Sequence, residues 1–370
     1  MYKDMVSVMD FGSSKITVLV GQREVNKSIR LLASAEYEYE GYAGGEFIDI
    51  ASLKTAMSKS IEDVERQLGC DIRDIFVGVP AEFCFAYDKL LTKTFPKKTK
   101  ITPKIVDSLF LEDDESNPYL THTVINKSSL FYIINDENKT NQPLGMIANK
   151  LQTRVGYILV ENKFKLIVGG ILDGLGIRNY DYISNSLSEA VYLLPEHKRN
   201  EGAIIVDCGY ISTSVAQSLG DGLKELKSFS LGGGFITADI SKAFEIPFEE
   251  AEELKNQAIV TLNPMGVEYY QTSSGKKFSI KAVNELILDR VDKILVMVGK
   301  CLDTFAMALP KYIPIYMTGG GLNYIEGIKD YFRKTLDRPV EFVTPKLLLY
   351  AKPDLSSSIS LLDMAINLYK

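Results

Sequence analysis

Apolar and polar positions at the start of the chain predict a β-hairpin followed by a third strand. Val6–Met9 and Ile16–Val20 are apolar and rich in β-branched residues, and the turn between them holds a glycine and two serines. Runs of this kind, joined by a short turn, are typical of paired antiparallel strands. A third strand is expected over Arg30–Tyr39.

Helical spacing begins at Ser52, from which apolar residues recur every three or four positions as far as Gly69. This pattern predicts an amphipathic helix with Ser52 as its N-cap. The longest such pattern lies between Asn284 and Leu309, and we expect its apolar stripe to face the core. The remaining patterns predict strands at 73–79, 130–134, 155–160, 313–317 and 340–343, and helices at 162–175, 185–194, 235–244, 324–335, 357–368 and from 247 onward.

Residues 81–161 differ in texture from the rest of the chain. They contain a lysine-rich patch at 97–100, an acidic cluster at 111–116 and turn-rich sequence between short strand-like runs. The sequence predicts a small inserted α+β module here. Its charge runs are interpreted as solvated faces, with a partner-binding surface as the alternative.

Composition places the chain among ordinary globular proteins. Its 370 residues suit two compact domains, and 46% hydrophobic with 24% charged residues is not the composition of a disordered chain. The formal net charge of −6 offers no basic surface, so we expect no nucleic-acid partner. Any anionic ligand would have to be held by local backbone geometry.

Cysteine and histidine do not predict a metal site, because four dispersed cysteines share no C-x-x-C spacing and only two histidines are present. The cysteines are interpreted as reduced thiols. The N-terminus lacks a basic region followed by an apolar stretch, and no run reaches the ~18 apolar residues that a membrane span requires. We therefore expect a soluble, cytoplasmic chain.

An internal repeat connects two distant stretches of the sequence. VSVMDFGSSKITVLVG (residues 6–21) and AIIVDCGYISTSVA (residues 203–216) both read as strand, Asp-x-Gly turn and strand. At one fixed offset Asp10 aligns with Asp207 and Gly12 with Gly209. We infer two halves of similar topology, each of which begins with a hairpin.

The residues of these turns suit phosphate chemistry. A glycine- and serine-rich turn lets backbone N–H groups converge on phosphate oxygens, and an aspartate at the strand end suits a hydrated Mg²⁺ ion. Ser13, Ser14 and Lys15 add donors to the first turn. One such hairpin alone could equally be a surface β-turn, but two in register strengthen the prediction.

A third element, IPIYMTGGGLNYIEG, places Gly319, Gly320 and Gly321 between an apolar strand and a helix. In that position the backbone can lie flat against a nucleoside, and the helix N-terminus favours phosphate. The pattern is neither the G-x-G-x-x-G of a dinucleotide fold nor a G-x-x-x-x-G-K-[ST] phosphate loop. It therefore predicts a different kind of nucleotide site.

The order hairpin, hairpin, strand-glycine-helix is similar to that of the actin and heat-shock ATPase superfamily, and within it the chain resembles the FtsA family of bacterial division proteins. The resemblance spans nearly the whole chain in order, and its stretches include GGEFIDI, NQPLG followed by VGYILV, GGGFITADISKAFEIPFEEAEELK, NELILDRVDKIL and YMTGGGLNYIEGI. It implies a two-lobed actin-like α/β fold with duplicated mixed sheets flanked by helices. The expected division is 1–80, 162–232 and 337–370 for the first lobe, 81–161 for an inserted small subdomain and 233–336 for the second lobe.

The resemblance also implies a nucleotide site between the lobes, with ATP and Mg²⁺ as cofactors. Asp10 and Asp207 match the residues that hold the ion through water. The matching nucleotide-binding positions are Gly12, Ser13, Ser14, Lys15, Gly209, Gly233, Gly234, Gly319, Gly320 and Gly321. Binding in such a cleft would close the lobes and favour head-to-tail self-assembly into filaments.

Departures from the family pattern lie in the second hairpin. Tyr210, Ile211 and Ser214 stand where the family has glycines and an acidic residue, so bulky side chains would obstruct the β- and γ-phosphates. The helix expected at 185–194 contains no glutamine to position water; Glu189 is the one catalytic candidate, with a solvated helix face as its alternative role. We expect slow hydrolysis or none. An active ATPase or phosphotransferase of the same superfamily, a nucleotide-free scaffold and a pilus-assembly homologue remain alternatives.

Family resemblance further implies a role as a scaffold that binds the acidic C-terminal tail of FtsZ or another division protein. Arg290 and Lys293 are the candidate contacts, with solvated helix charges as the alternative. The closing sequence DLSSSISLLDMAINLYK resembles the last helix of the ATPase core, and it is too poor in basic residues for an interfacial membrane helix. We expect a peripheral protein at the cytoplasmic face of the division site, held there by a further C-terminal helix or by a partner.

Overall fold

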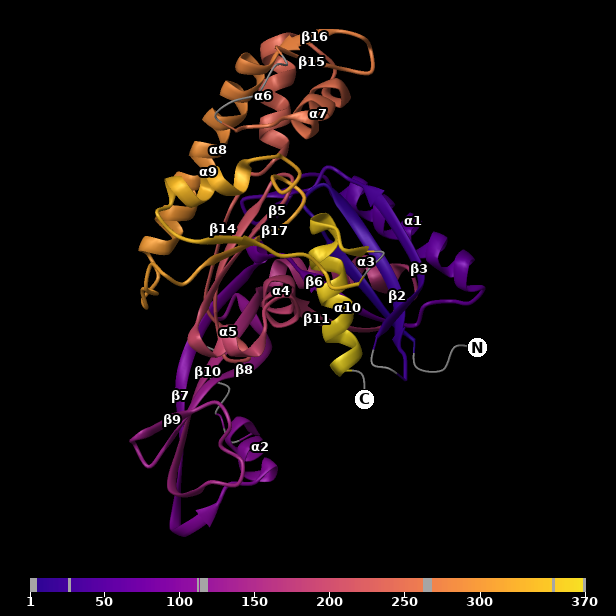
Figure 1. Ribbon diagram of the computed structural model, residues 1–370. Helices are drawn as coiled ribbons and strands as arrows, with labels where there is room; N and C mark the ends of the chain where they lie inside the picture. The colour runs from indigo at the N-terminus through magenta and orange to yellow at the C-terminus, as the bar shows by residue number, and fades with distance from the viewer. Residues whose placement is uncertain are drawn as a thin grey trace.

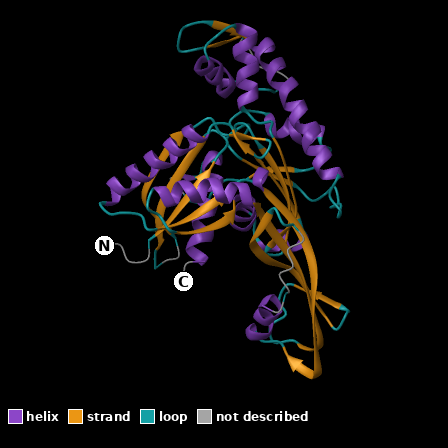
Figure 2. Ribbon diagram, turned by 180° about the vertical axis from the view of Figure 1, so that it is seen from behind, coloured by secondary structure: helices purple, strands orange, loops and turns teal. Residues whose placement is uncertain are grey.

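The computed structural model describes residues 5–25, 28–111, 113, 119–261, 268–347 and 350–368. Two five-stranded sheets and one four-stranded sheet form its framework. A group of helices lies at one end of the molecule, and long strands extend from the other end (Figures 1 and 2). The two five-stranded sheets lie between these ends.

The first sheet has the order β11-β6-β1-β2-β3. β1, β2 and β3 are antiparallel neighbours, whereas β6 and β11 run parallel to β1. The strands are β1 (Val6–Phe11), β2 (Lys15–Arg23), β3 (Ile29–Glu38), β6 (Asp74–Val79) and β11 (Asn179–Ser184). Successive residues of β1 alternate between two apolar layers, so both faces of the sheet are buried.

Helices cover the two faces of this first sheet. α1 (Ile50–Leu68) and α3 (Asn162–Gly174) pack with Met9 and Phe11 on one face. α10 (Ser356–Leu368) packs on the other face with Val6 and Val8, next to α4 (Asn185–Leu193). The last helix of the chain is thereby part of the first half.

The second sheet repeats the topology of the first, in the order β14-β13-β12-β17-β18. Three strands are again antiparallel neighbours and two are parallel. They are β12 (Ala203–Cys208), β13 (Thr213–Leu219), β14 (Gly222–Phe229), β17 (Ile315–Thr318) and β18 (Val340–Phe342). Asp10 pairs with Thr17 as Asp207 pairs with Ser214, which confirms the predicted repeat.

One face of this second sheet carries the helices at the end of the molecule. They are α6 (Gly234–Phe244), α7 (Phe248–Gln257), α8 (Ile280–Asp303) and α9 (Ile328–Thr335). Ile287, Val291 and Ile294 of α8 are fully buried in this layer, as the apolar stripe predicted. The other face packs on α4, with α5 (Glu196–Glu201) nearby.

The inserted module forms the third sheet, in the order β7-β10-β8-β9. Its elements are β7 (Cys84–Lys100), α2 (Pro103–Leu111), β8 (His122–Ile134), β9 (Asn138–Thr140) and β10 (Ile147–Glu161). Asp88 forms ion pairs with Arg154 of the module and with Lys224 of β14. The predicted α+β module therefore exists and is fastened to the second sheet.

Short elements complete the chain. They are the two-stranded pairs β4 (Tyr42–Ala43) with β5 (Glu46–Phe47) and β15 (Tyr269–Gln271) with β16 (Lys277–Ser279), and the 3-10 helices Ala81–Phe83 and Pro353–Leu355.

Element boundaries differ from the sequence prediction where caps decide them. α1 begins at Ile50, because the side chain of Asp49 rather than Ser52 accepts the capping hydrogen bond from Ala51 N. α9 begins only at Ile328, after Gly327, whose φ of 84° ends any helix that approaches it. The sequence predicted these two helices, and the capping geometry moved their first residues.

Sheet membership also differs from the expected division into lobes. β12–β14 and β18 hydrogen-bond into one sheet with β17. Residues 203–229 and 340–342 therefore lie with the second half, although the expected division put them with the first. The reason is the repeat itself, since the second hairpin opens the second sheet as the first hairpin opens the first.

Candidate functional site

The turns of the two hairpins have matching geometry. Gly12 N–H donates to Lys15 O at 3.0 Å, and Gly209 N–H donates to Ser212 O at 2.9 Å. The tips of the two turns touch, because Ile211 N–H donates to Ser13 Oγ at 2.9 Å. The two copies of the sequence repeat therefore form two turns that face each other between the sheets.

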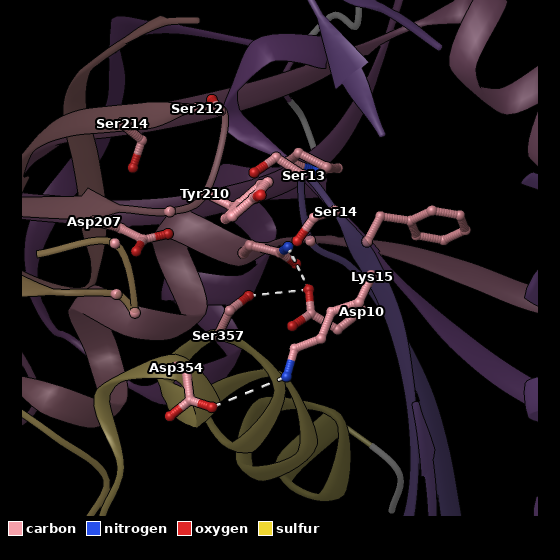
Figure 3. A pocket seen from close by; sticks show the side chains of 18 of the residues that line it. Asp10, Ser13, Ser14, Lys15, Asp207, Tyr210, Ser212, Ser214, Asp354 and Ser357 are labelled. Atoms are coloured by element: carbon pink, nitrogen blue, oxygen red, sulfur yellow. Dashed lines mark hydrogen bonds and ion pairs between the residues drawn. The ribbon is translucent and has the colours of Figure 1, made fainter. Parts of the chain in front are cut away.

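A cavity of about 230 Å³ lies where these turns meet (Figure 3). Most of the predicted nucleotide and ion residues line it: Asp10, Gly12, Ser13, Ser14, Lys15, Asp207, Gly209, Gly319, Gly320 and Gly321. Tyr210 and Ser214 line it as well. The cavity walls described here do not include Gly233 and Gly234.

Two carboxylates at the strand ends carry raised pKa values. Burial raises the pKa of Asp10 to about 6, although hydrogen bonds from Ser357 Oγ (3.0 Å) and Asn185 Nδ2 (2.8 Å) favour its charged form. Burial, and then repulsion from Asp10, raise the pKa of Asp207 to about 7. Among the described residues, none hydrogen-bonds to the Asp207 side chain. A bound proton or cation would therefore reduce the repulsion between the Asp10 and Asp207 carboxylates.

Glu189 lies behind this corner, in the interior. Its side chain is 1% exposed, and Oε1 has no hydrogen-bond partner among the described residues. Burial, followed by the charges of Asp207 and Asp10, holds the pKa of Glu189 well above its usual range. The alternative of a solvated helix face is wrong, because Glu189 is buried in the interior. Both its burial and the neighbouring carboxylates favour the neutral form of the Glu189 carboxyl group.

Cations at the cavity are already paired with carboxylates. Lys15 Nζ lies 2.8 Å from Glu36 Oε2 and 3.9 Å from Asp354. Lys255, which is 2% exposed, places Nζ 2.7 Å from Glu252. A phosphate group would have to compete with these carboxylates for either lysine.

Backbone donors of the glycine loops bind the second hairpin. Gly233 N–H donates to Gly209 O at 2.9 Å, Gly234 N–H to Tyr210 O at 2.7 Å, and Gly321 N–H to Cys208 O at 2.8 Å. The N-terminus of α6 is thereby capped by carbonyl groups of the hairpin turn. These N–H groups donate to carbonyl oxygens of the chain and are not free to donate to phosphate oxygens.

Close backbone contact explains why these loops contain glycine. A Cβ on Gly233 would lie 2.1 Å from Gly321 O, and one on Gly319 would lie 2.2 Å from Asp207 Oδ1. A Cβ on Gly320 would lie 2.8 Å from Asp354 Cβ. The glycines let the two loops and the hairpin touch each other, which is a packing requirement independent of any ligand.

The predicted partner residues lie on α8, at the end of the molecule that carries the helices. Arg290 is 19% exposed and forms a bidentate pair with Asp239 of α6, at 2.6 and 2.8 Å. Its guanidinium also lies 5.7 Å from the ring of Phe235. Lys293 is exposed beside a groove of about 510 Å³ lined by Leu231, Asp289, Asp292, Val296 and Met297.

Several cavity residues were missed by sequence reasoning. They are Tyr42, Asn185, Glu252, Lys255, Asp354 and Ser357. Asn185 and Ser357 stand at the starts of predicted helices, so their side chains were read as helix ends. Lys255 offered a weak signal, as the one lysine of an acidic amphipathic segment.

The described residues contain neither a cluster of metal-ligating side chains nor a membrane-spanning helix. Across these ranges, no three His, Cys, Asp or Glu side chains come together in a group that could hold a metal ion. Within the same part of the chain, no helix has both the length and the apolar character that crossing a membrane requires.

Comparison with known sequences gives a family. The sequence model of the family described as "Cell division protein FtsA" matches residues 204–360. FtsA of Staphylococcus epidermidis is 23% identical over 97% of this chain and 78% of its own, and FtsA of Neisseria meningitidis serogroup B is 22% identical over 98% and 90%. The chain is therefore similar to FtsA over nearly its whole length. The resemblance inferred from the sequence motifs is confirmed.

Solved structures confirm the fold of this FtsA-like chain. A chain of a PilM–PilN type IV pilus biogenesis complex aligns with a TM-score of 0.64 at 14% identity, covering 99% of both chains. MreB5 of Spiroplasma citri bound to AMPPNP aligns at 0.56 and 12% identity, covering 100% of this chain and 97% of that one. The fold expected from the sequence, an actin-like α/β fold, is therefore the observed one.

Whether this FtsA-like cleft fits a nucleoside triphosphate with Mg²⁺ can be judged from its residues. Asp10 and Asp207 suit a cation, since burial leaves both with raised pKa values. The space does not suit the nucleotide, because about 230 Å³ is below the roughly 300–1,000 Å³ of ordinary ligand pockets. The three glycine-loop N–H groups and both lysines are engaged. In this arrangement the residues do not fit ATP.

Proposed function

We propose that this chain is an actin-like scaffold of bacterial cell division, which assembles with copies of itself and binds a second division protein. The observation that supports this most is the alignment with FtsA over 97% of the chain, inserted module included. We place the protein at the cytoplasmic face of the division site, where a partner or a C-terminal segment would hold it to the membrane.

The scaffold role requires no chemistry at the cleft. Glu189 is buried with a raised pKa, and Lys15 is bound to carboxylates. We therefore propose a protein whose assembly does not depend on ATP hydrolysis. ATP and Mg²⁺ remain cofactors that the family resemblance implies, and the side chains of the cleft would have to rearrange to admit them.

The FtsZ tail is the proposed partner, and α8 is its proposed contact. Lys293 is exposed and flanks an open groove with apolar walls at Val296 and Met297. An acidic peptide with apolar residues would pair with Lys293 and pack on the apolar walls, on the side of the groove away from Asp289 and Asp292. Arg290 also has a structural role, because its ion pair with Asp239 joins α8 to α6.

A binding measurement with a peptide of the C-terminal FtsZ tail from the same organism tests this proposal. We expect Lys293→Glu to weaken peptide binding by at least tenfold, which is about 1.4 kcal/mol. Lys97→Glu in the inserted module is the matched charge reversal and should leave binding unchanged. Failure of the unaltered chain to bind, or equal binding by the Lys293→Glu chain, would contradict the assignment.

Arg290 needs a test that separates contact from structure. Arg290→Asp alone breaks the pair with Asp239, whereas Arg290→Asp combined with Asp239→Arg restores a pair of opposite sense. If Arg290 touches the peptide, the double variant folds normally and still binds weakly. Normal binding by the double variant would assign Arg290 to holding α6 against α8.

A further inference from the structure

Tyr210 projects from the turn of the second hairpin into the cleft, close to Ser13 and Ser14 of the first hairpin (Figure 3). Its ring lies against the backbone of Gly234, where an added Cβ would meet three ring carbons at 2.9–3.0 Å. Phe248, at the start of α7, packs edge-on to the ring with centroids 6.2 Å apart. The ring therefore has a defined seat between a glycine and a second aromatic side chain.

This seat adjoins the surface that the sequence assigned to nucleotide. Gly234 is one of the glycines that the family resemblance placed opposite the nucleotide, yet the Tyr210 ring covers it on the side where a Cβ would project. The ring leaves a cavity of about 230 Å³ beside it, lined by Asp10, Asp207 and Gly320.

Two further contacts hold the turn of Tyr210 in place. Ile211 N–H donates to Ser13 Oγ at 2.9 Å, and the Ile211 side chain comes within 3.2 Å of the position that a Cβ on Gly41 would take. Gly233 and Gly234 donate their N–H groups to the carbonyls of Gly209 and Tyr210. The hairpin is thus bound to the first half on one side and to α6 on the other.

We propose that the Tyr210 ring is a built-in occupant of the cleft, which takes the place of a nucleotide and keeps the two halves closed without one. The chain then needs no ATP–Mg²⁺ to reach its closed form. A ligand that binds only an open cleft is opposed by the free energy needed to unseat the ring and break the Ser13–Ile211 hydrogen bond. This inference does not depend on which partner the scaffold binds.

The internal repeat supplies the sharpest variant for a test. Position 210 corresponds to Ser13 of the first hairpin, so Tyr210→Ser gives the second turn the side chain that the first turn already carries. Tyr210→Phe is the matched control, because it keeps the ring on Gly234 and removes only the hydroxyl. Tyr210→Gly replaces the serine variant if that variant does not fold.

Isothermal titration with ATP and MgCl₂ measures the first consequence. We expect no saturable binding below about 1 mM for the unaltered chain and for Tyr210→Phe, and at least tenfold tighter binding for Tyr210→Ser. Saturable micromolar binding by the unaltered chain would overturn the proposal. So would a gain by Tyr210→Phe, or the absence of a gain in folded Tyr210→Ser and Tyr210→Gly chains.

Hydrogen exchange at Ile211 measures the second consequence, the closed cleft. We expect the Ile211 amide to be protected in the unaltered chain with or without ATP–Mg²⁺. In Tyr210→Ser its exchange should be at least tenfold faster, and ATP–Mg²⁺ should slow it again. Equal protection in all variants would show that the ring does not hold the halves together. Binding of the FtsZ tail peptide should be unchanged by these variants, so failure of the partner assignment remains distinguishable.

Discussion

Replacing Asp207 by asparagine tests the electrostatics of the cleft most directly. Asparagine has nearly the same shape as aspartate, and no described residue hydrogen-bonds to the Asp207 side chain, so the change removes mainly the charge. Burial and the neighbouring Asp10 raise the pKa of Asp207 to about 7, from 3.8 for a free side chain. Glu189 adds a third carboxyl group to the same corner.

The sign and size of the effect follow from proton linkage. Because its pKa is higher in the folded chain, the aspartate favours folding at low pH, and this stability is lost as the pH rises toward 7. At 1.36 kcal/mol for each unit of pKa, the loss between pH 5 and pH 8 is about 2–3 kcal/mol. Asparagine does not titrate. The Asp207→Asn chain should therefore gain about 2–3 kcal/mol over the unaltered chain across this interval.

Urea denaturation at pH 5 and at pH 8, followed by far-UV circular dichroism, measures this difference. The exposed Asp71 supplies the control, since Asp71→Asn should change stability equally at both pH values. A stability difference for Asp207→Asn that is the same at pH 5 and pH 8 would refute the reasoning. It would mean that the carboxylate is ionised at a cost no greater than in the unfolded chain.

Two further predictions concern packing around the cleft. Gly233→Ala should destabilise the chain by about 1–3 kcal/mol, since its Cβ would lie 2.1 Å from a backbone oxygen, whereas Gly170→Ala on the open face of α3 should stabilise it by about 0.5–1 kcal/mol in the same denaturation assay. Equal effects at the two glycines would contradict the packing argument. Glu252→Ala should cost about 3 kcal/mol by leaving the buried Lys255 unpaired, and Glu252→Gln combined with Lys255→Met should cost less by thermal unfolding. A larger loss in the double variant would show that the pair itself stabilises the lobe.

Sequence patterns predicted most of the elements, because strands and amphipathic helices are written in short-range periodicity. The repeat of Asp10 and Gly12 at Asp207 and Gly209 predicted two hairpins of equal register, and the structure has them. Errors lay at element ends, at the boundary between the halves, and in strands that were not predicted, such as β7, β11 and β14. There, caps and strand pairing between distant segments decide the outcome.

The candidate site was predicted less completely than the fold. Turn residues could be named because they lie within the repeated motif itself. Asn185 and Ser357 could not be named, since each hydrogen-bonds to Asp10 from a helix far away from Asp10 in the sequence. For Glu189 the helix pattern alone left a solvated face as an alternative, and only the packing of α4 against both sheets shows that the residue is buried.

By itself, the sequence determined that this chain has two related halves, each opening with an Asp-x-Gly hairpin, and an inserted module. Tertiary structure alone decided what the cleft between them contains. The ring of Tyr210 lies on Gly234, and the glycine-loop N–H groups bind the hairpin carbonyls. The physical reason is that motif spacing fixes the backbone of a turn, whereas the direction of its side chains depends on the packing of segments far away in the sequence.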